Sequence, residues 1–220
     1  MYQTAFLLSS FLLFVSLSGC KSKIEKVEEK QLPFYNSPDF TPIFLSKDEN
    51  LEQKIPHQIA DFSFTDQEGK TITQKEIENK IHVADFVFTS CGSICPVMLD
   101  HMKLISNAFE NNPKIEFLSY SVTPWVDNVK RLKIYTQIHK IDNPNWHFLT
   151  GNRADIYNLA RQSYFAEEDL GFTKDSTKFL HTEHMLLIDQ NKRIRGIYNG
   201  TLELEMYQLI KDIQTLLKKG

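Results

Sequence analysis

Residues 81–96 read IHVADFVFTSCGSICP, and this stretch decides the fold. Its first part is almost wholly apolar and predicts a buried β-strand from Ile81 to Thr89. Cys91 and Cys95 follow this strand, and Pro96 opens a run with helical spacing. Because a helix N-terminus presents unpaired amides and the positive end of a dipole, it favours ionised sulfur. Thiolates attack disulfides and bind soft metals such as Cu(I), so the stretch predicts a thiol site.

Strands and helices alternate on both sides of this stretch. Upstream, the segment from Ile59 to Thr73 alternates in polarity around a turn signal at residues 66–69 and predicts a hairpin. Downstream, the patterns predict a helix at 96–110, a strand at 115–122, a helix at 127–140, a short strand at 146–149, a helix at 152–163, a hairpin of strands 185–189 and 194–198, and a helix at 204–218. We therefore expect an α/β fold with a central mixed β-sheet flanked by helices, an N-terminal β-hairpin and an extra hairpin near the C-terminus.

Composition restricts the class of protein. The chain has 220 residues, of which 41% are hydrophobic and 24% charged, which suits one globular domain with appended segments. The net charge is -3, the basic residues are scattered and no phosphate-binding glycine-rich loop is present. Nucleic acid is therefore not an expected partner.

The first twenty residues resemble an export signal. Residues 5–17 are apolar and uncharged but too short for a membrane span, and they lead into Leu17-Ser18-Gly19-Cys20. This tetrapeptide resembles the lipobox of bacterial lipoproteins, which implies a signal peptide at 1–19, a lipid on Cys20 and an extracytoplasmic, membrane-anchored protein on the periplasmic side. The alternative is a cysteine that merely ends a hydrophobic segment.

A spacer is predicted to follow Cys20. Residues 21–30 are of mixed charge with few apolar groups, and residues 32–49 contain three prolines. We expect residues 20–50 to form a flexible tether, which either extends as a spacer or wraps over the domain surface. The domain is assigned to residues 51–220, with its folded part beginning near Ile55.

Cys91 and Cys95 remain as an isolated pair in an exported domain. Such a pair could close into a structural disulfide. A bridge over three residues constrains little chain, because the entropic benefit grows with loop length. This favours chemistry over stability as the role of the pair.

The element order with cysteines at the first strand-to-helix junction resembles the thioredoxin fold. Residues 88–96 are similar to the F-T-x-C-x-x-x-C-P motif of the Sco/SenC copper-chaperone family, and His181-Thr182 with residues 185–189 is similar to its H-S/T-x-x-x-x-L-I-D segment. Residues 121–127 resemble its S-V-D-P-E-R-D stretch. Of the four charged residues in that stretch, only the last carries over, as Asp127. The resemblance implies a metallochaperone, not an enzyme, that delivers copper to the dinuclear centre of cytochrome c oxidase through the copper-accepting subunit of that haem-copper oxidase.

The ligand set implied by the resemblance is Cys91, Cys95 and His181. Two thiolates and an imidazole suit copper, because Cu(I) accepts low-coordinate sulfur sites, whereas structural Zn(II) usually takes four ligands. His184 is the alternative, since the register at a strand entry can slip. The other five histidines are expected at the surface or in the core: His57, His82, His101, His139 and His147.

Asp85 supports a second hypothesis. It interrupts the apolar strand six residues before Cys91, a spacing that resembles the buried acid of thioredoxins. In an exported thiol-disulfide oxidoreductase, Cys91 would attack, Cys95 would resolve the mixed disulfide and Asp85 would move protons, with a thiol reductant as partner. Against this, dedicated reductases have C-x-x-C and a proline before the facing strand. The alternative without a chemical role is that Asp85 is a hydrated or lysine-paired acid at the end of the sheet.

Overall fold

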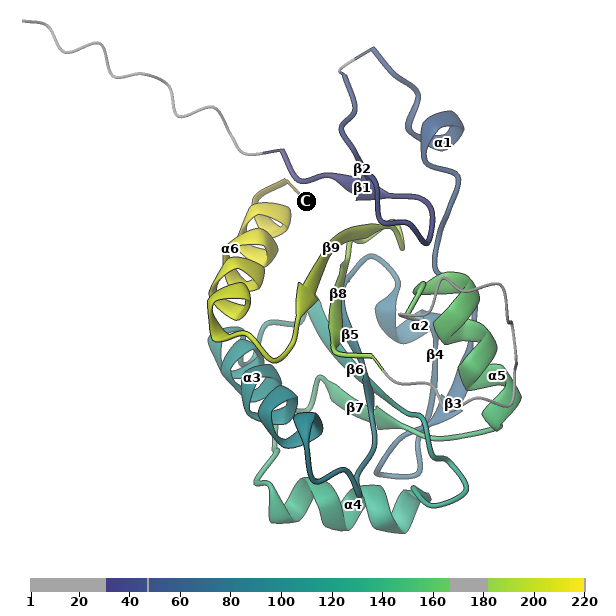
Figure 1. Cartoon of the computed structure of the whole chain (residues 1–220), viewed down its shortest axis with the longest axis vertical. Coiled ribbons are helices and arrows are strands. Elements are labelled where there is room, and N and C mark those ends of the chain that lie inside the picture. The colour runs from purple at the N-terminus through teal and green to yellow at the C-terminus, as the bar shows by residue number, and fades with distance from the viewer. Residues whose placement is uncertain (1–30, 47, 167–181, 220) are drawn as a thin grey trace, which may run out of the picture.

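A computed structural model describes residues 31–46, 48–166 and 182–219. It has a mixed sheet with helices on both faces and a small separate hairpin (Figure 1). The strands are β1 (Phe34–Tyr35), β2 (Pro42–Ile43), β3 (Ser63–Thr65), β4 (Thr71–Thr73), β5 (Ile81–Val87), β6 (Ile115–Ser121), β7 (Trp146–Leu149), β8 (His184–Ile188) and β9 (Ile194–Asn199). The helices are α1 (Leu51–Lys54), α2 (Gln74–Ile77), α3 (Ile94–Ala108), α4 (Val129–Ile138), α5 (Arg153–Asn158), the π-helical turn η1 (Leu159–Ser163) and α6 (Glu203–Lys219).

The main sheet has seven strands in the order β2-β1-β9-β8-β5-β6-β7. Strands β5, β6 and β7 are parallel, and β8 and β9 are antiparallel to their neighbours. Residues of α3, α4 and α6 pack into one core cluster, and residues of α2, α5 and the β3–β4 hairpin pack into the other (Figure 1). The predicted α/β class and central mixed sheet are confirmed.

Strand β5 lies between β8 and β6 and is buried along its whole length. Its side chains alternate, so that Val83 and Val87 face α3 and α6 while Ala84 and Phe86 face the opposite layer. Burial on both faces explains why the strand is apolar almost without interruption. Its carboxyl end leads into α3, which places the cysteines at one end of the sheet.

Most predicted elements lie within two residues of their observed bounds. The β3–β4 turn contains Gly69 at φ 78°, a left-handed conformation that glycine adopts without strain. Helix α3 begins at Ile94, two residues before the predicted start at Pro96. Cys95 therefore lies inside the first helical turn, where Pro96 is tolerated because its missing N–H needs no partner.

The N-terminal part of the fold begins earlier than the sequence indicates. We expected residues 20–50 to be a flexible tether and folding to begin near Ile55, but β1 pairs with β9 and Leu32 is 2% exposed. The physical reason is Arg195, which donates to the carbonyls of Leu32 and Pro33 at 2.8 and 2.9 Å and lies over the Phe34 ring. Residues 32–45 thus wrap over the domain, the second of the two alternatives. Cys20 and residues 21–30 lie outside the described residues.

Candidate functional site

Cys91 lies in the turn between β5 and α3, and Cys95 lies in the first turn of α3. The Cys91 N–H donates to the Phe88 carbonyl at 3.0 Å, which closes the turn directly after the strand. Both Cys91 and Cys95 are free thiols and half-buried. The backbone N–H of Ser93 donates to Cys91 Sγ at 3.5 Å. The sequence-predicted pair is therefore together, reduced and reachable from solvent.

Cys91 has the acidic thiol of the pair. Partial burial raises the pKa of Cys91, but hydrogen bonds from the N–H groups of Cys95, Ser93 and Ile94 and from the Cys95 thiol outweigh it, so the net pKa is lowered. These donors belong to the start of α3, as expected for a thiolate at a helix N-terminus. Of the two thiols, Cys91 is therefore the one that ionises more readily.

Cys95 has the opposite character. Burial raises its pKa to about 12, and the hydrogen bond to Cys91 and the charges of Cys91 and Asp85 add to the effect. A pair in which one thiol is acidic and the other holds its proton suits an attacking and a resolving cysteine. The same pair can bind a soft metal once the second proton leaves.

Asp85 lies beneath the thiols, on the face of β5 that points to α3. It is 1% exposed, and its Oδ1 has no hydrogen-bond partner among the described residues. Burial raises the pKa of Asp85 to about 7, while a hydrogen bond with Ser119 opposes the shift. Ser119 in turn accepts from Trp146 Nε1 at 2.9 Å. Within the described part of the chain Asp85 is buried and no lysine pairs with it, so the lysine-paired alternative is not what the structure has.

Tyr135 of α4 is electrostatically coupled to the site. Burial raises the pKa of the Tyr135 hydroxyl, and the charges of Cys95, Asp85, Asp127 and Cys91 raise it further. This coupling shows that the helix stands close to both thiols. The helix predicted at 127–140 contains Tyr135, but its sequence position gives no sign of this coupling to the thiols.

Asp127 holds the turn to the rest of the fold. Its carboxylate is fully buried and accepts from Ser121 Oγ at 2.7 Å, Thr123 Oγ1 at 2.9 Å and the backbone and hydroxyl of Thr89. Arg131 Nε lies 3.3 Å from the same carboxylate. We call these five residues the Asp127 cluster. Sequence reasoning noted Asp127 through the family stretch but assigned it no role, and it missed Arg131.

Arg131 extends this cluster to the residue before Cys91. Its guanidinium donates to Thr89 Oγ1 at 2.8 Å and to Ser90 Oγ at 2.5 Å. The two residues that precede Cys91 are therefore both held by the Arg131 side chain of α4. The sequence feature that could have indicated these contacts is the pair of hydroxyl side chains, Thr89 and Ser90, directly before Cys91.

The seven histidines lie in different surroundings, and only two of them are candidate copper ligands. His181 lies outside the described residues, so its prediction stays open. His184 points to the face of the sheet opposite α3 and contacts Phe40 edge-on, with 5.7 Å between ring centroids. The remaining five make hydrogen bonds or ring contacts in the fold: His57, His82, His101, His139 and His147. Without His181, no group of three potential metal-binding side chains forms among the described residues.

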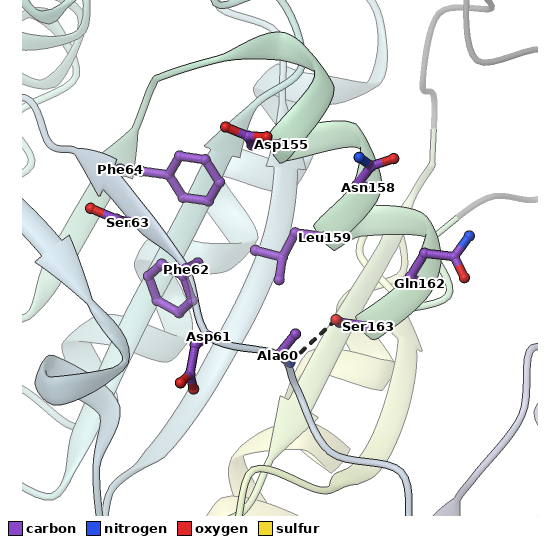
Figure 2. Close-up of a pocket in the computed structure, with 10 residues that line it drawn as sticks. All are labelled: Ala60, Asp61, Phe62, Ser63, Phe64, Asp155, Asn158, Leu159, Gln162 and Ser163. Atoms are coloured by element: carbon purple, nitrogen blue, oxygen red, sulfur yellow. Dashed lines mark hydrogen bonds between the residues drawn. The ribbon is translucent and has the colours of Figure 1, made fainter.

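A cavity of about 540 Å³ lies away from the cysteines, between β3 and the α5–η1 helix. Figure 2 shows Phe62, Phe64 and Leu159 facing one another across it, with Asp61 and Asp155 at its edge. Its lining side chains include no thiol or imidazole, so it contributes nothing to the thiol site. In the described part of the chain, no helix has the length and apolar character needed to cross a membrane.

The SCO1/SenC family model matches residues 51–218, which contain the cysteine turn and every strand from β3 onward. The chain belongs to the SCO1/SenC family. It is 26% identical over 169 residues to the SCO1 protein homolog of Bacillus subtilis, a match that covers 76% of this chain and 86% of that protein.

Solved SCO1/SenC structures share the fold. A family lipoprotein from Bacillus anthracis aligns at TM-score 0.63 and 29% identity, over 73% of this chain and 95% of its own. BsSco, a cytochrome c oxidase assembly protein with a disulfide switch, aligns at TM-score 0.63 and 25% identity, over 74% and 95%. ScoI of Bradyrhizobium japonicum, solved with copper bound, aligns at TM-score 0.57 and 25% identity, over 71% and 98%.

Proposed function

We propose that this SCO1/SenC protein is a copper chaperone that binds copper through Cys91, Cys95 and His181. The observation that carries the proposal is the pair of free, half-buried thiols at the N-terminus of α3, inside the matched family region. The copper-bound relative supports the choice of metal. Two sulfur ligands favour Cu(I), and an imidazole maintains affinity for Cu(II).

The acceptor that we propose is the dinuclear copper centre of a cytochrome c oxidase. The support is the assembly role given for BsSco, which shares the fold and 25% of aligned residues. A site with three protein ligands suits delivery, because an incoming thiolate can bind the metal before the donor ligands leave. We also propose that a lipid on Cys20 anchors the chain on the extracytoplasmic side of a membrane; the lipobox and the lipoprotein relative support this.

Copper titration of the reduced, purified full chain tests the ligand set. We expect one copper per chain, with sulfur and nitrogen ligation in the X-ray absorption spectrum, and a loss of at least tenfold in affinity for Cys91→Ser, Cys95→Ser or His181→Ala. The matched control is His184→Ala, which should bind copper like the parent because that ring packs on Phe40. Equal affinity of the parent and His181→Ala would reject His181 as a ligand.

A second function is supported by the asymmetry of the thiols. The low pKa of Cys91, the raised pKa of Cys95 and the carboxyl of Asp85 beside them match the needs of thiol-disulfide exchange. In this reaction the Cys91 thiolate attacks a target disulfide, and Cys95 then displaces the target thiolate to leave a Cys91–Cys95 disulfide. A thiol reductant must return this disulfide to the dithiol.

Stopped-flow reduction of a disulfide-containing target separates the two functions. We expect the Cys95→Ser variant to stop at the mixed disulfide, visible as a covalent adduct, while the parent releases reduced target. If the parent and Cys95→Ser release target at the same rate, Cys95 does not resolve and the oxidoreductase is rejected.

A further inference from the structure

A groove of about 560 Å³ runs along α4 beside the cysteine turn. Thr89, two residues before Cys91, lines one end of it, and Ile138 lies near the C-terminal end of the helix. Tyr135, which stands close to the thiols, lines it as well. The groove therefore reaches the turn that carries Cys91.

Two aliphatic side chains of the groove are open to solvent. Ile134 is 45% exposed and Ile138 is 70% exposed. They lie four residues apart, so they are neighbours on one face of the helix. Single exposed apolar residues are common, but an adjacent pair in a groove beside a reactive thiol marks a contact surface.

The helix is strongly basic. Residues 128–140 contain no acidic residue, whereas the whole chain has a net charge of -3. The cationic side chains of this segment are Lys130, Arg131, Lys133 and Lys140. Arg131 pairs with Asp127 and Lys133 pairs with Glu68, while Lys130 and Lys140 are exposed and form no ion pair within the described residues. Lys130 lines the groove, and Lys140 directly follows His139, the last lining residue in the sequence, so positive charge remains available beside the groove.

We propose that this groove is the docking site for a segment of a partner protein in which aliphatic side chains are flanked by carboxylates. The aliphatic side chains cover Ile134 and Ile138, and the carboxylates pair with Lys130 and Lys140. Docking brings the partner's cysteines to Cys91. The inference rests on the proposed function, since it specifies the partner of the same thiol site.

Peptide disulfides provide the probe. One peptide carries glutamates and leucines beside a cysteine held as a pyridyl disulfide, and a second carries lysines in place of the glutamates. The Cys91 thiolate attacks the peptide sulfur, the new bond joins the two cysteines, and the old disulfide breaks with release of pyridine-2-thione, which is followed by absorbance. The protein is the reduced full chain in mild detergent, without copper.

We expect the acidic peptide to react about fivefold or more faster than the basic one at low ionic strength, with the difference shrinking as salt is added. Lys130→Glu should abolish or invert this preference. Ile138→Ser should slow both peptides, because both carry leucines. Dipyridyl disulfide, which has no side chains to dock, should react equally with the parent and both variants.

Matched controls lie at the other end of the sheet. Lys75→Glu on α2 changes the net charge by the same amount as Lys130→Glu, and Phe44→Ser removes an apolar side chain that is 58% exposed. Both should retain the parent's preference and rate. The proposal is overturned if the parent does not distinguish the peptides, or if Lys130→Glu and Lys75→Glu have the same effect.

This readout is independent of copper. If the full chain fails to bind copper but the peptide preference depends on Lys130 and Ile138, the copper function fails and the docking site stands. If copper binds through the cysteines while the peptides react alike, the docking site fails alone.

Discussion

The burial of Asp85 affects both the chemistry of the thiols and the stability of the fold. A buried carboxylate with an unpaired oxygen is costly, so the fold favours the protonated acid and its pKa rises to about 7. An acid that titrates near neutrality can accept the proton that Cys95 must lose, either to resolve a disulfide or to bind copper. The residue that disrupts the apolar strand is thus the one able to move that proton.

The pH dependence of stability tests this state of Asp85. The unfolded residue titrates near 3.8 and the folded one near 7, so the contribution of Asp85 to stability is greatest below about pH 4 and falls as the pH rises to about 7, by on the order of 4 kcal/mol. Asp85→Asn should remove this fall and stabilise the protein at neutral pH. Urea unfolding of parent and variant between about pH 4 and 8 measures the difference.

The control for this experiment is Asp100→Asn, whose side chain is 76% exposed on α3. It should leave the pH profile unchanged. A profile of Asp85→Asn that falls as steeply as the parent's would show that Asp85 is not the group responsible.

At the level of elements, the Asp127 cluster fastens the cysteine turn to α4. Asp127→Asn keeps the shape of the side chain but replaces one acceptor oxygen by an NH2 group. This donor would face the hydroxyl, amide and guanidinium donors that now bind the carboxylate. We expect a loss of about 2–3 kcal/mol in the free energy of unfolding by urea. The variant should also show an altered rate of Cys91 with dipyridyl disulfide, since Thr89 and Ser90 lose their fixed positions.

Asp142→Asn is the matched control, because Asp142 is an exposed acid just beyond α4. It should change neither unfolding nor thiol reactivity. Parent-like values for both measurements in Asp127→Asn would mean that the turn holds its geometry without the cluster.

Elements with strong local patterns were predictable from the sequence. The strand at 146–149 was predicted with its observed bounds, and β5, β6 and the β8–β9 hairpin were predicted to within two residues, because apolar side chains repeat at the period of the structure. Strands β1 and β2 have two residues each, in a segment with three prolines. No period can be read from so short a strand.

The candidate site likewise has a part that the sequence predicts and a part that it does not. Asp85, Cys91 and Cys95 lie on one strand, the turn after it and the first turn of α3, so their spacing in the sequence brings them together. The Asp127 cluster joins Thr89 to a residue 38 positions later, across the crossover from β5 to α4. Such a contact depends on how two strands pair, which the sequence pattern does not specify.

For the molecule as a whole, Arg195 decides how the N-terminal segment is held. It donates to Leu32 and Pro33 and pairs with Asp189 at 3.0 Å. Arg195→Ala leaves these acceptors without their donor and should cost about 3 kcal/mol, or roughly 6–12 °C in thermal midpoint. Limited proteolysis should then cut residues 36–46 faster than in the parent.

Lys211→Ala on the exposed side of α6 serves as the comparison and should melt and resist protease like the parent. Unchanged proteolysis in Arg195→Ala would show that β1 is held by its pairing with β9 alone.

The N-terminal segment is attached at the end of the sheet opposite the cysteines. Tyr35 pairs with Ile194, which lies level with the start of β5, whereas the cysteines follow the end of β5 (Figure 1). A chain spans at most about 3.6 Å per residue, so a lipid on Cys20 would keep Leu32 within about 40 Å of the bilayer. The tether of a lipid on Cys20 would therefore enter the domain at the end of the sheet opposite the thiols, which leaves the thiol end uncovered by the anchor.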